Sequence, residues 1–229
     1  MATTSAVNVS DFTETIEPHL EEEGRAGGGL LLRPVRHLPL RQIAAQELSE
    51  QYPERKVYVV DSLCASLGQG LLVWYAARMK NEGRGIGAVR DWLEENKLHL
   101  CHWFTVDDLH FLKRGGRISS ATAVLGTMLS IKPIITFSDD GQLQSIAKVR
   151  GRRQVQDKIL ELLRARFQSG RRYNLAVANG GAPEEMAEFA ARLKAEFPNY
   201  EHFWEGVMDA TLSVYIGDGV IGGGIQFLD

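Results

Sequence analysis

Short apolar runs alternate with longer segments of helical hydrophobic period along this 229-residue chain. Residues 57–60 form a wholly apolar run of the kind that is buried in a parallel sheet, and further strands are expected at 98–105, 131–137, 143–149 and 174–178. Amphipathic segments predict helices at 10–20, 42–51, 68–80, 86–97, 121–130, 154–168 and 183–196. The remaining C-terminal residues are expected to form strands with a glycine-rich loop. This alternation predicts an α/β fold in two units, residues 1–97 and 98–229.

No stretch of the sequence reaches the length of a membrane span, and the first residues lack the basic, apolar and small-residue regions of a signal peptide. We therefore expect a cytoplasmic protein without a transmembrane segment. Cys64 and Cys101 lie far apart and lack metal-ligand spacing, which favours reduced core thiols over a disulfide or a zinc site.

The net charge of −3 conceals an asymmetry, because residues 113–153 carry eight basic and two acidic side chains. The basic residues are Lys113, Arg114, Arg117, Lys132, Lys148, Arg150, Arg152 and Arg153. This segment lacks the interleaved aromatic residues of a base-stacking platform, so an acidic protein or a phosphate-bearing ligand is a better candidate partner than nucleic acid.

Residues 103–120 combine a short helix with a basic turn at 113–117. Thr105 is expected to cap the helix. The two adjacent glycines of the turn are expected to end it and to fix the direction in which Arg117 leaves. The basic turn suits an acidic group. A helical connection whose charges are merely solvated explains the same pattern equally well.

Motifs of self-sufficient enzymes are missing from the chain: it has no nucleophile elbow, phosphate loop, zinc helix or dinucleotide fingerprint. His102 and His110 are expected on a strand and a helix, an arrangement that disfavours a shared metal ion. We therefore expect a binding protein with no metal and no cofactor.

Three segments resemble the DegV family of bacterial fatty-acid-binding proteins. They are VYVVDSLCASLGQGLLVWYAARMKNEG, WFTVDDLHFLKRGGRISS and LGTMLSIKPIITFSDDGQLQSIAKVRGRR, within a continuous match from about residue 47 to residue 153. The resemblance implies an N-terminal parallel-sheet domain and a C-terminal mixed-sheet domain that hold an acyl chain between or beside them. Such a carrier needs an apolar tunnel and a few hydroxyl or cationic groups that hold the carboxylate.

The head-group motifs of the family match unevenly. Thr4 and Ser5 resemble a TSQ-like motif, whereas LLRPVRHLPLR at residues 31–41 stands in place of an SSxLSGTY-like motif. Codons for residues 32–41 can be chosen so that a shift of one nucleotide reads SGLSGTYR. We therefore hypothesise a local frameshift within residues 24–41, which sequencing of the gene tests.

Both ends of the chain also depart from the family pattern. The chain begins almost at the TSQ-like motif, which predicts an N-terminal truncation and an incomplete sheet in residues 1–97. Near the other end, YIGDGVIGGGIQFLD resembles the closing strand of the family but lacks its histidine-threonine-glycine sequence before Asp218.

The resemblance implies a non-enzymatic subunit that binds a long-chain fatty acid as its ligand and presents the carboxylate to a partner fatty acid kinase. Ligand-binding candidates are Thr4, Ser5 and Arg117, and candidates for docking the kinase are Lys113, Arg114, Arg150, Arg152 and Arg153. Two alternatives stay open. One is a phosphoryl-transfer or hydrolytic enzyme that uses Asp61, Ser62 and the basic turn, and the other is a family variant that folds but binds no ligand.

Overall fold

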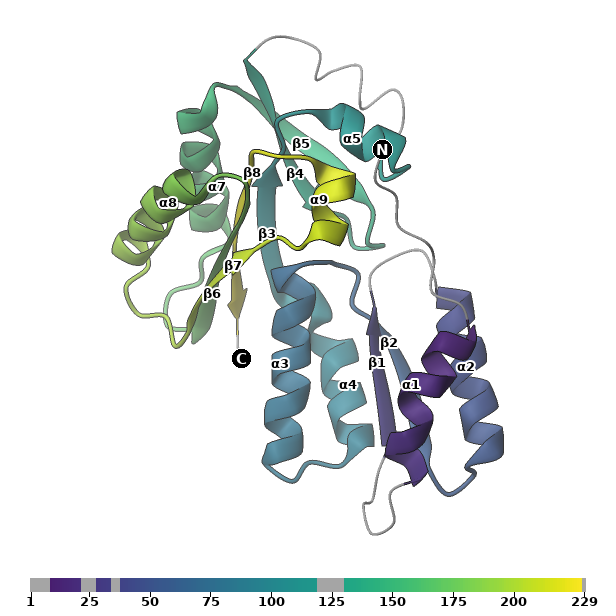
Figure 1. The fold of residues 1–229 in the computed structure, drawn as a ribbon. Helices are drawn as coiled ribbons and strands as arrows, with labels where there is room; N and C mark the ends of the chain where they lie inside the picture. The colour runs from purple at the N-terminus through teal and green to yellow at the C-terminus, as the bar shows by residue number, and fades with distance from the viewer. Residues whose placement is uncertain (1–8, 22–27, 34–37, 119–129, 228–229) are drawn as a thin grey trace. The chain divides into compact units, whose positions relative to one another are not determined.

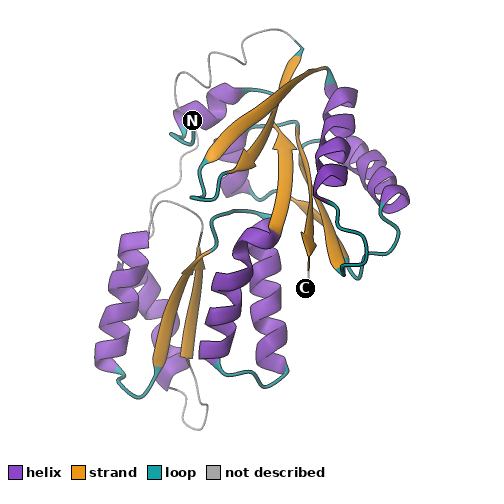
Figure 2. Cartoon of the chain, turned by 180° about the vertical axis from the view of Figure 1, so that it is seen from behind, coloured by secondary structure: helices purple, strands orange, loops and turns teal. Residues whose placement is uncertain are grey.

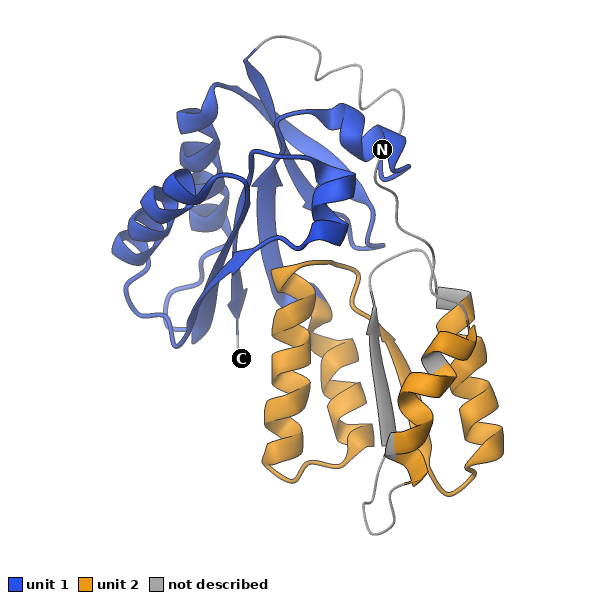
Figure 3. Cartoon of the chain, in the orientation of Figure 1, with its two compact units in different colours: residues 1–3, 98–229 blue, residues 4–97 orange. Residues whose placement is uncertain are grey.

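The computed structural model describes residues 9–21, 28–33, 38–118 and 130–227. This part of the chain falls into two compact units, one within residues 4–97 and the other within residues 98–229 (Figure 3). The helix expected at 121–130 lies almost wholly outside the described residues. No helix in the described ranges has both the length and the apolar character needed to cross a bilayer.

The N-terminal unit is built on a pair of parallel strands. Its elements are α1 (Val9–Glu21), β1 (Gly28–Arg33), α2 (Leu38–Gln51), β2 (Lys56–Asp61), α3 (Leu67–Asn81) and α4 (Ile86–Asn96). The strands pair in register from Gly28 with Lys56 to Arg33 with Asp61. Helices α1 and α2 lie on one side of them and α3 and α4 on the other (Figure 1). The apolar run at 57–60 is thus a strand of a parallel sheet, as predicted.

The C-terminal unit is built on a six-stranded mixed sheet. Its elements are η1 (Lys97–His99), β3 (Leu100–Thr105), α5 (Leu109–Arg114), β4 (Ile131–Phe137), β5 (Leu143–Arg150), α7 (Arg152–Arg166), β6 (Tyr173–Gly180), α8 (Pro183–Glu196), β7 (Phe203–Val207), α9 (Ala210–Ile216) and β8 (Val220–Phe227). The strand order is β5-β4-β3-β8-β6-β7, and of these pairs only β6 and β7 run parallel. The predicted α/β fold class is confirmed.

The two faces of this sheet have different cores. Helices α7 and α8 cover one face, where a large cluster includes Ile159, Leu163, Phe189 and Leu193, all at 0% exposure. Helices α5 and α9 contact each other on the opposite face, where a smaller cluster surrounds Phe104 (Figures 1 and 2). Because side chains alternate along a strand, β3, β4 and β8 each contribute residues to both clusters.

Two local predictions were wrong. Residues 210–216 form the helix α9 rather than a strand, because the Asp209 carboxylate caps it by accepting a hydrogen bond of 2.8 Å from the Leu212 N–H. Thr105 does not cap α5. It ends β3, and its hydroxyl donates to the Pro133 carbonyl at 2.7 Å, while Asp108 caps α5 by accepting from the His110 N–H at 2.8 Å.

Candidate functional site

On the sheet face opposite α7 and α8, the central strands carry very small side chains. Ala178 lies directly opposite Gly222, and Ala176 lies opposite Gly224. The intervening Val177 points the other way and belongs to the cluster under α7 and α8. These four residues, Ala176, Ala178, Gly222 and Gly224, form a small-residue strip on β6 and β8.

The glycines of this strip are required by the close approach of β3. A Cβ atom on Gly222 would lie 2.7 Å from the Cβ of Phe104, and one on Gly224 would lie 2.8 Å from the Cβ of His102. Gly223 faces the opposite side, where an added Cβ would lie 2.7 Å from Cε1 of Phe189. The run of three glycines therefore serves packing on both faces, and it leaves bare backbone along the strip.

Two polar side chains share the face of the small-residue strip. His102 lies opposite Gly224, and Gln226 lies two residues farther along β8. Both ring nitrogens of His102 and the Oε1 of Gln226 are shielded from solvent and have no hydrogen-bond partner among the described residues. Burial lowers the pKa of His102 to about 4, so the ring is neutral at physiological pH.

The surroundings of His102 are apolar. Its ring lies 5.1 Å from the ring of Phe137 on β4, and Phe104 follows two residues later on the same face of β3. The hydroxyl of the adjacent Thr136 donates to the His102 backbone carbonyl at 2.8 Å. The small-residue strip is thus bordered by aromatic rings and by one neutral imidazole.

The basic turn is held against α9 by an aromatic ring. The guanidinium carbon of Arg117 lies 4.0 Å from the centre of the Tyr215 ring, and its Nη1 donates to the Gly115 carbonyl at 2.5 Å. Lys113 and Arg114 occupy the last turn of α5 and are exposed. Gly116 adopts a φ of 66°, which glycine tolerates best, and α5 ends at Arg114, directly before the two glycines, as the sequence predicted.

The three arginines at the start of α7 have different environments. Arg152 Nε lies 2.8 Å from Glu185 Oε2, its Nη1 lies 3.0 Å from Asp107 Oδ1, and it also donates to the Gly219 carbonyl. The Arg153 side chain is 82% exposed, and its Nη1 comes no closer than 4.0 Å to Oε1 of Glu188. Arg150 is exposed at the end of β5. Arg152 therefore joins several elements of the C-terminal unit, whereas Arg150 and Arg153 point to solvent.

An acidic depression lies beside the basic turn. A pocket of about 330 Å³ is lined by Asp107, Asp108, Phe111, Ser213, Gly217 and Asp218. Despite these carboxylates, no group of three or more potential metal ligands is assembled within the described ranges. The basic segment of the sequence is thus not a uniformly basic surface.

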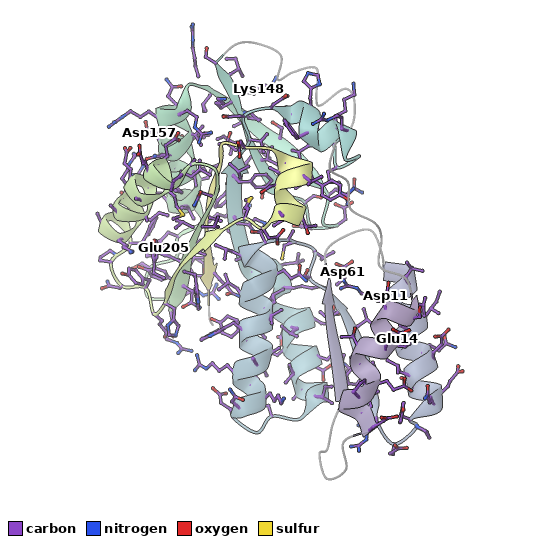
Figure 4. All side chains as sticks on the ribbon, in the orientation of Figure 1. Asp11, Glu14, Asp61, Lys148, Asp157 and Glu205 are labelled. Atoms are coloured by element: carbon purple, nitrogen blue, oxygen red, sulfur yellow. The ribbon has the colours of Figure 1, made fainter. Side chains whose placement is uncertain are left out.

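In the N-terminal unit, a strained loop follows the carboxyl end of β2, where Asp61 lies (Figure 4). Leu63 and Ser66 adopt positive φ angles of 54° and 56°. Asp61 Oδ1 accepts from the Leu63 N–H, and the buried Ser62 hydroxyl donates to the Cys64 carbonyl, each at 3.1 Å. These contacts give Asp61 and Ser62 a role in shaping the loop.

Two other titratable side chains, Cys64 and Arg41, lie in or near the loop after β2. Burial raises the pKa of the Cys64 thiol to about 12, which makes it unreactive, and both cysteines are free. Arg41 lies in α2, where burial lowers its pKa and the nearby Asp61 carboxylate opposes that shift. A cationic side chain is therefore present close to the loop after β2.

Several candidates from the sequence lie outside the described residues. Thr4, Ser5 and residues 34–37 belong to this group. Arg117 lies at the basic turn in the C-terminal unit. Sequence reasoning missed the small-residue strip and the two polar side chains that share its face, His102 and Gln226. The run of glycines at 222–224 was the available signal, but its meaning depends on which strands lie opposite.

Comparisons with known proteins agree with this architecture. A family model described as an uncharacterised protein of the DegV family matches residues 1–227. The chain belongs to the DegV family. A DegV domain-containing protein of Clostridium perfringens is 42% identical over 156 residues, which are 68% of this chain and 54% of the relative. Protein DegV of Bacillus subtilis is 35% identical over 167 residues, or 72% of this chain and 59% of that protein. The matches thus span little more than half the length of these DegV relatives.

Solved DegV structures share the fold. One from Thermus thermophilus, described as fatty acid binding of a DegV family protein, has a TM-score of 0.87 and 30% identity, and the match covers 99% of this chain and 79% of the other. DegV of Bacillus subtilis, described as a fatty acid binding protein, has a TM-score of 0.80 and 27% identity with coverage of 99% and 79%. The family assignment made from the sequence is confirmed.

Proposed function

We propose that this protein binds a long-chain fatty acid and presents its carboxylate to a partner kinase for phosphorylation. The observation that carries the binding part is the small-residue strip, a buried set of alanine and glycine residues beside Phe104 and Phe137 on the sheet face opposite α7 and α8. The solved DegV relatives described as fatty acid binding proteins support the same ligand class.

An extended acyl chain suits such a surface. Side chains no larger than a methyl group let the chain approach the backbone closely, and the neighbouring aromatic rings supply flanking contacts. Each buried methylene contributes about 0.8 kcal/mol, so burial of its methylene groups supplies most of the affinity of a long chain. The polar head group then needs only a few contacts for orientation.

The carboxylate needs hydroxyl or cationic groups, for which we propose Thr4, Ser5 and Arg117. The Tyr215 ring and the Gly115 carbonyl orient the Arg117 guanidinium. A guanidinium has five N–H donors, so this orientation is compatible with a carboxylate contact through its remaining donors.

The exposed Lys113, Arg114, Arg150 and Arg153 are the basic residues that we propose for docking the kinase. Exposed charges mainly increase the encounter rate and set the orientation of a partner. Arg152 is better placed to hold the C-terminal unit together, because two carboxylates and a carbonyl surround it.

Mass spectrometry under native conditions tests the binding proposal on protein purified from bacteria. A co-purified fatty acid is expected in the wild type. Ala178→Leu fills the small-residue strip and is expected to lose the ligand, whereas Ala191→Leu on the exposed side of α8 keeps it. Thermal unfolding of both variants distinguishes a blocked surface from a misfolded one. Protein that is empty and turns over phosphorylated compounds would favour an enzyme, and empty, inactive protein a variant that binds no ligand.

A further inference from the structure

We propose that His102 and Gln226 form a recognition site for a hydroxyl group on the acyl chain, so that the preferred ligand is a hydroxylated long-chain fatty acid. This inference rests on the proposed function, because it places the ligand on the small-residue strip. The two residues face the strip together: His102 is paired with Gly224, and Gln226 lies two positions along the same face of β8.

The spacing of the two side chains allows both to reach one small group. Diagonal neighbours on adjacent antiparallel strands have Cα atoms about 7–8 Å apart. The imidazole and the carboxamide each extend several bonds from the backbone, and Gly224, between them, contributes no side chain. A single oxygen atom above Gly224 is therefore within reach of both.

Neither polar group has a hydrogen-bond partner in the part of the chain that the structure describes. Both ring nitrogens of His102 and Oε1 of Gln226 are buried without a hydrogen-bond partner among the described residues. Buried polar groups in native proteins nearly always have a partner, and an exception calls for a ligand, an ion or a water molecule. The nearest described polar side chain on β4, Thr136, uses its hydroxyl on the His102 carbonyl rather than on the ring.

The chemistry of the pair matches an alcohol. A neutral imidazole offers one N–H donor and one acceptor, and Oε1 of Gln226 adds a second acceptor. A hydroxyl group can accept from the imidazole N–H and donate to Oε1, which gives one hydrogen bond to each residue. A methylene group can do neither, and a keto group can only accept.

An ion is a poorer fit than an alcohol. The ring of His102 lies against Phe137, and its own strand places Phe104 beside it on the same face. No group of potential metal ligands is assembled around it within the described ranges. A neutral, apolar environment disfavours a charged ligand at this depth.

Binding titrations on delipidated protein test this inference. The ligands are octadecanoic acid and a series of hydroxyoctadecanoic acids whose hydroxyl moves along the chain. For one position of the hydroxyl group, the hydroxy acid is expected to bind at least about 10-fold more tightly than octadecanoic acid. A site with unpaired polar groups discriminates strongly in favour of a ligand that pairs with them. The corresponding oxo acid is expected to lie between the two.

Variants of His102 and Gln226 test whether these two residues cause the preference for the hydroxy acid. His102→Phe and Gln226→Leu are expected to reduce the preference toward unity while octadecanoic acid still binds, and His110→Phe, at an exposed position on α5, is expected to leave it unchanged. If a variant misfolds, nitrogen NMR of the His102 ring in the wild type provides a second measurement. The hydroxy acid is expected to shift the ring nitrogen signals, and octadecanoic acid is not.

The outcomes separate the two proposals. Binding of octadecanoic acid with no preference for any hydroxy isomer would overturn the hydroxyl site and leave fatty acid binding intact. A preference that survives in both His102→Phe and Gln226→Leu would also overturn it, because the hydroxyl would then be recognised elsewhere. Failure of every fatty acid to bind would overturn the proposed function and the hydroxyl site with it.

Discussion

The guanidinium carbon of Arg117 lies 4.0 Å from the centre of the Tyr215 ring, and this contact fixes the basic turn on α9. A cation–π contact of this kind contributes about 0.5–2 kcal/mol, depending on desolvation. The direction of Arg117 is therefore set by a residue almost a hundred positions away, in addition to the two glycines that precede it.

Gly115→Ala is expected to destabilise the basic turn. The added Cβ would lie 2.5 Å from Cδ1 of Tyr215, so the ring that holds Arg117 must move. We expect the free energy of unfolding in urea to fall by about 1–3 kcal/mol. Gly70→Ala in α3 is the control, because nothing lies within 4 Å of its added Cβ; alanine there is expected to raise the free energy of unfolding by about 0.5–1 kcal/mol. Equal effects of the two substitutions would contradict close packing at Gly115.

Charge reversal of Lys113 and Arg114 tests kinase docking without touching Arg117. The double variant Lys113→Glu/Arg114→Glu is expected to slow acyl phosphate formation by about 10-fold at low salt, with a smaller effect at high salt because screening weakens the encounter. Fatty acid affinity is expected to stay unchanged. Lys80→Glu/Arg84→Glu reverses two exposed charges in the other unit and serves as the control. Unaltered acyl phosphate kinetics in the first variant would remove these residues from the docking surface.

Arg152 and Arg153 are adjacent in sequence but are expected to respond differently to alanine. The Arg152 side chain is 24% exposed and pairs with Asp107 and Glu185, whereas the Arg153 side chain is 82% exposed. Arg152→Ala is expected to lower the free energy of unfolding by about 1–3 kcal/mol, because it leaves Glu185 and the Gly219 carbonyl without this donor. Arg153→Ala is expected to change it by less than about 0.5 kcal/mol. Chemical denaturation measures the free energy of unfolding of both variants. An unchanged value for Arg152→Ala would argue for a surface role of Arg152 instead.

Stability is expected to depend on the protonation of His102. Its pKa falls from 6.5 in the unfolded chain to about 4 in the folded protein because the ring is buried. Between these values the unfolded chain binds a proton that the folded protein does not, so the free energy of unfolding decreases as the pH is lowered, by up to roughly 3 kcal/mol. Above pH 6.5, the pKa of His102 in the unfolded chain, the contribution of His102 to the free energy of unfolding no longer changes with pH.

Unfolding curves of the wild type and His102→Phe, measured from neutral pH to about pH 4, isolate this contribution. The difference in stability between them is expected to shift in favour of the variant as the pH falls, because phenylalanine does not titrate. His110→Phe, at an exposed position on α5, is the control for the change of a histidine to phenylalanine. A pH-independent difference between the wild type and His102→Phe would show that His102 titrates normally.

Local sequence patterns were sufficient for much of the fold. The helix expected at 183–196 matches α8, and the hairpin expected at 131–149 matches β4 and β5. The DegV resemblance also rested on local strings. These features succeed because helix and strand periods, caps and turns are decided within a few residues.

The remaining features depended on which segments meet in space. Residues 210–216 form a helix because Asp209 caps it and α5 packs against it. The sequence does not distinguish Arg152 from its basic neighbours. In the structure it pairs with Asp107 and Glu185, which come from distant parts of the chain.

Strand pairing decided the candidate site. The sequence by itself determined the family, the α/β class and the basic turn, but it could not show that Ala176 and His102 lie on either side of Gly224. The face on which a side chain lies follows from alternation along its own strand, whereas its neighbours there follow from the register between strands that are remote in sequence. Only the tertiary structure supplied that register, and with it the small-residue strip and the two polar side chains beside it that have no partner among the described residues.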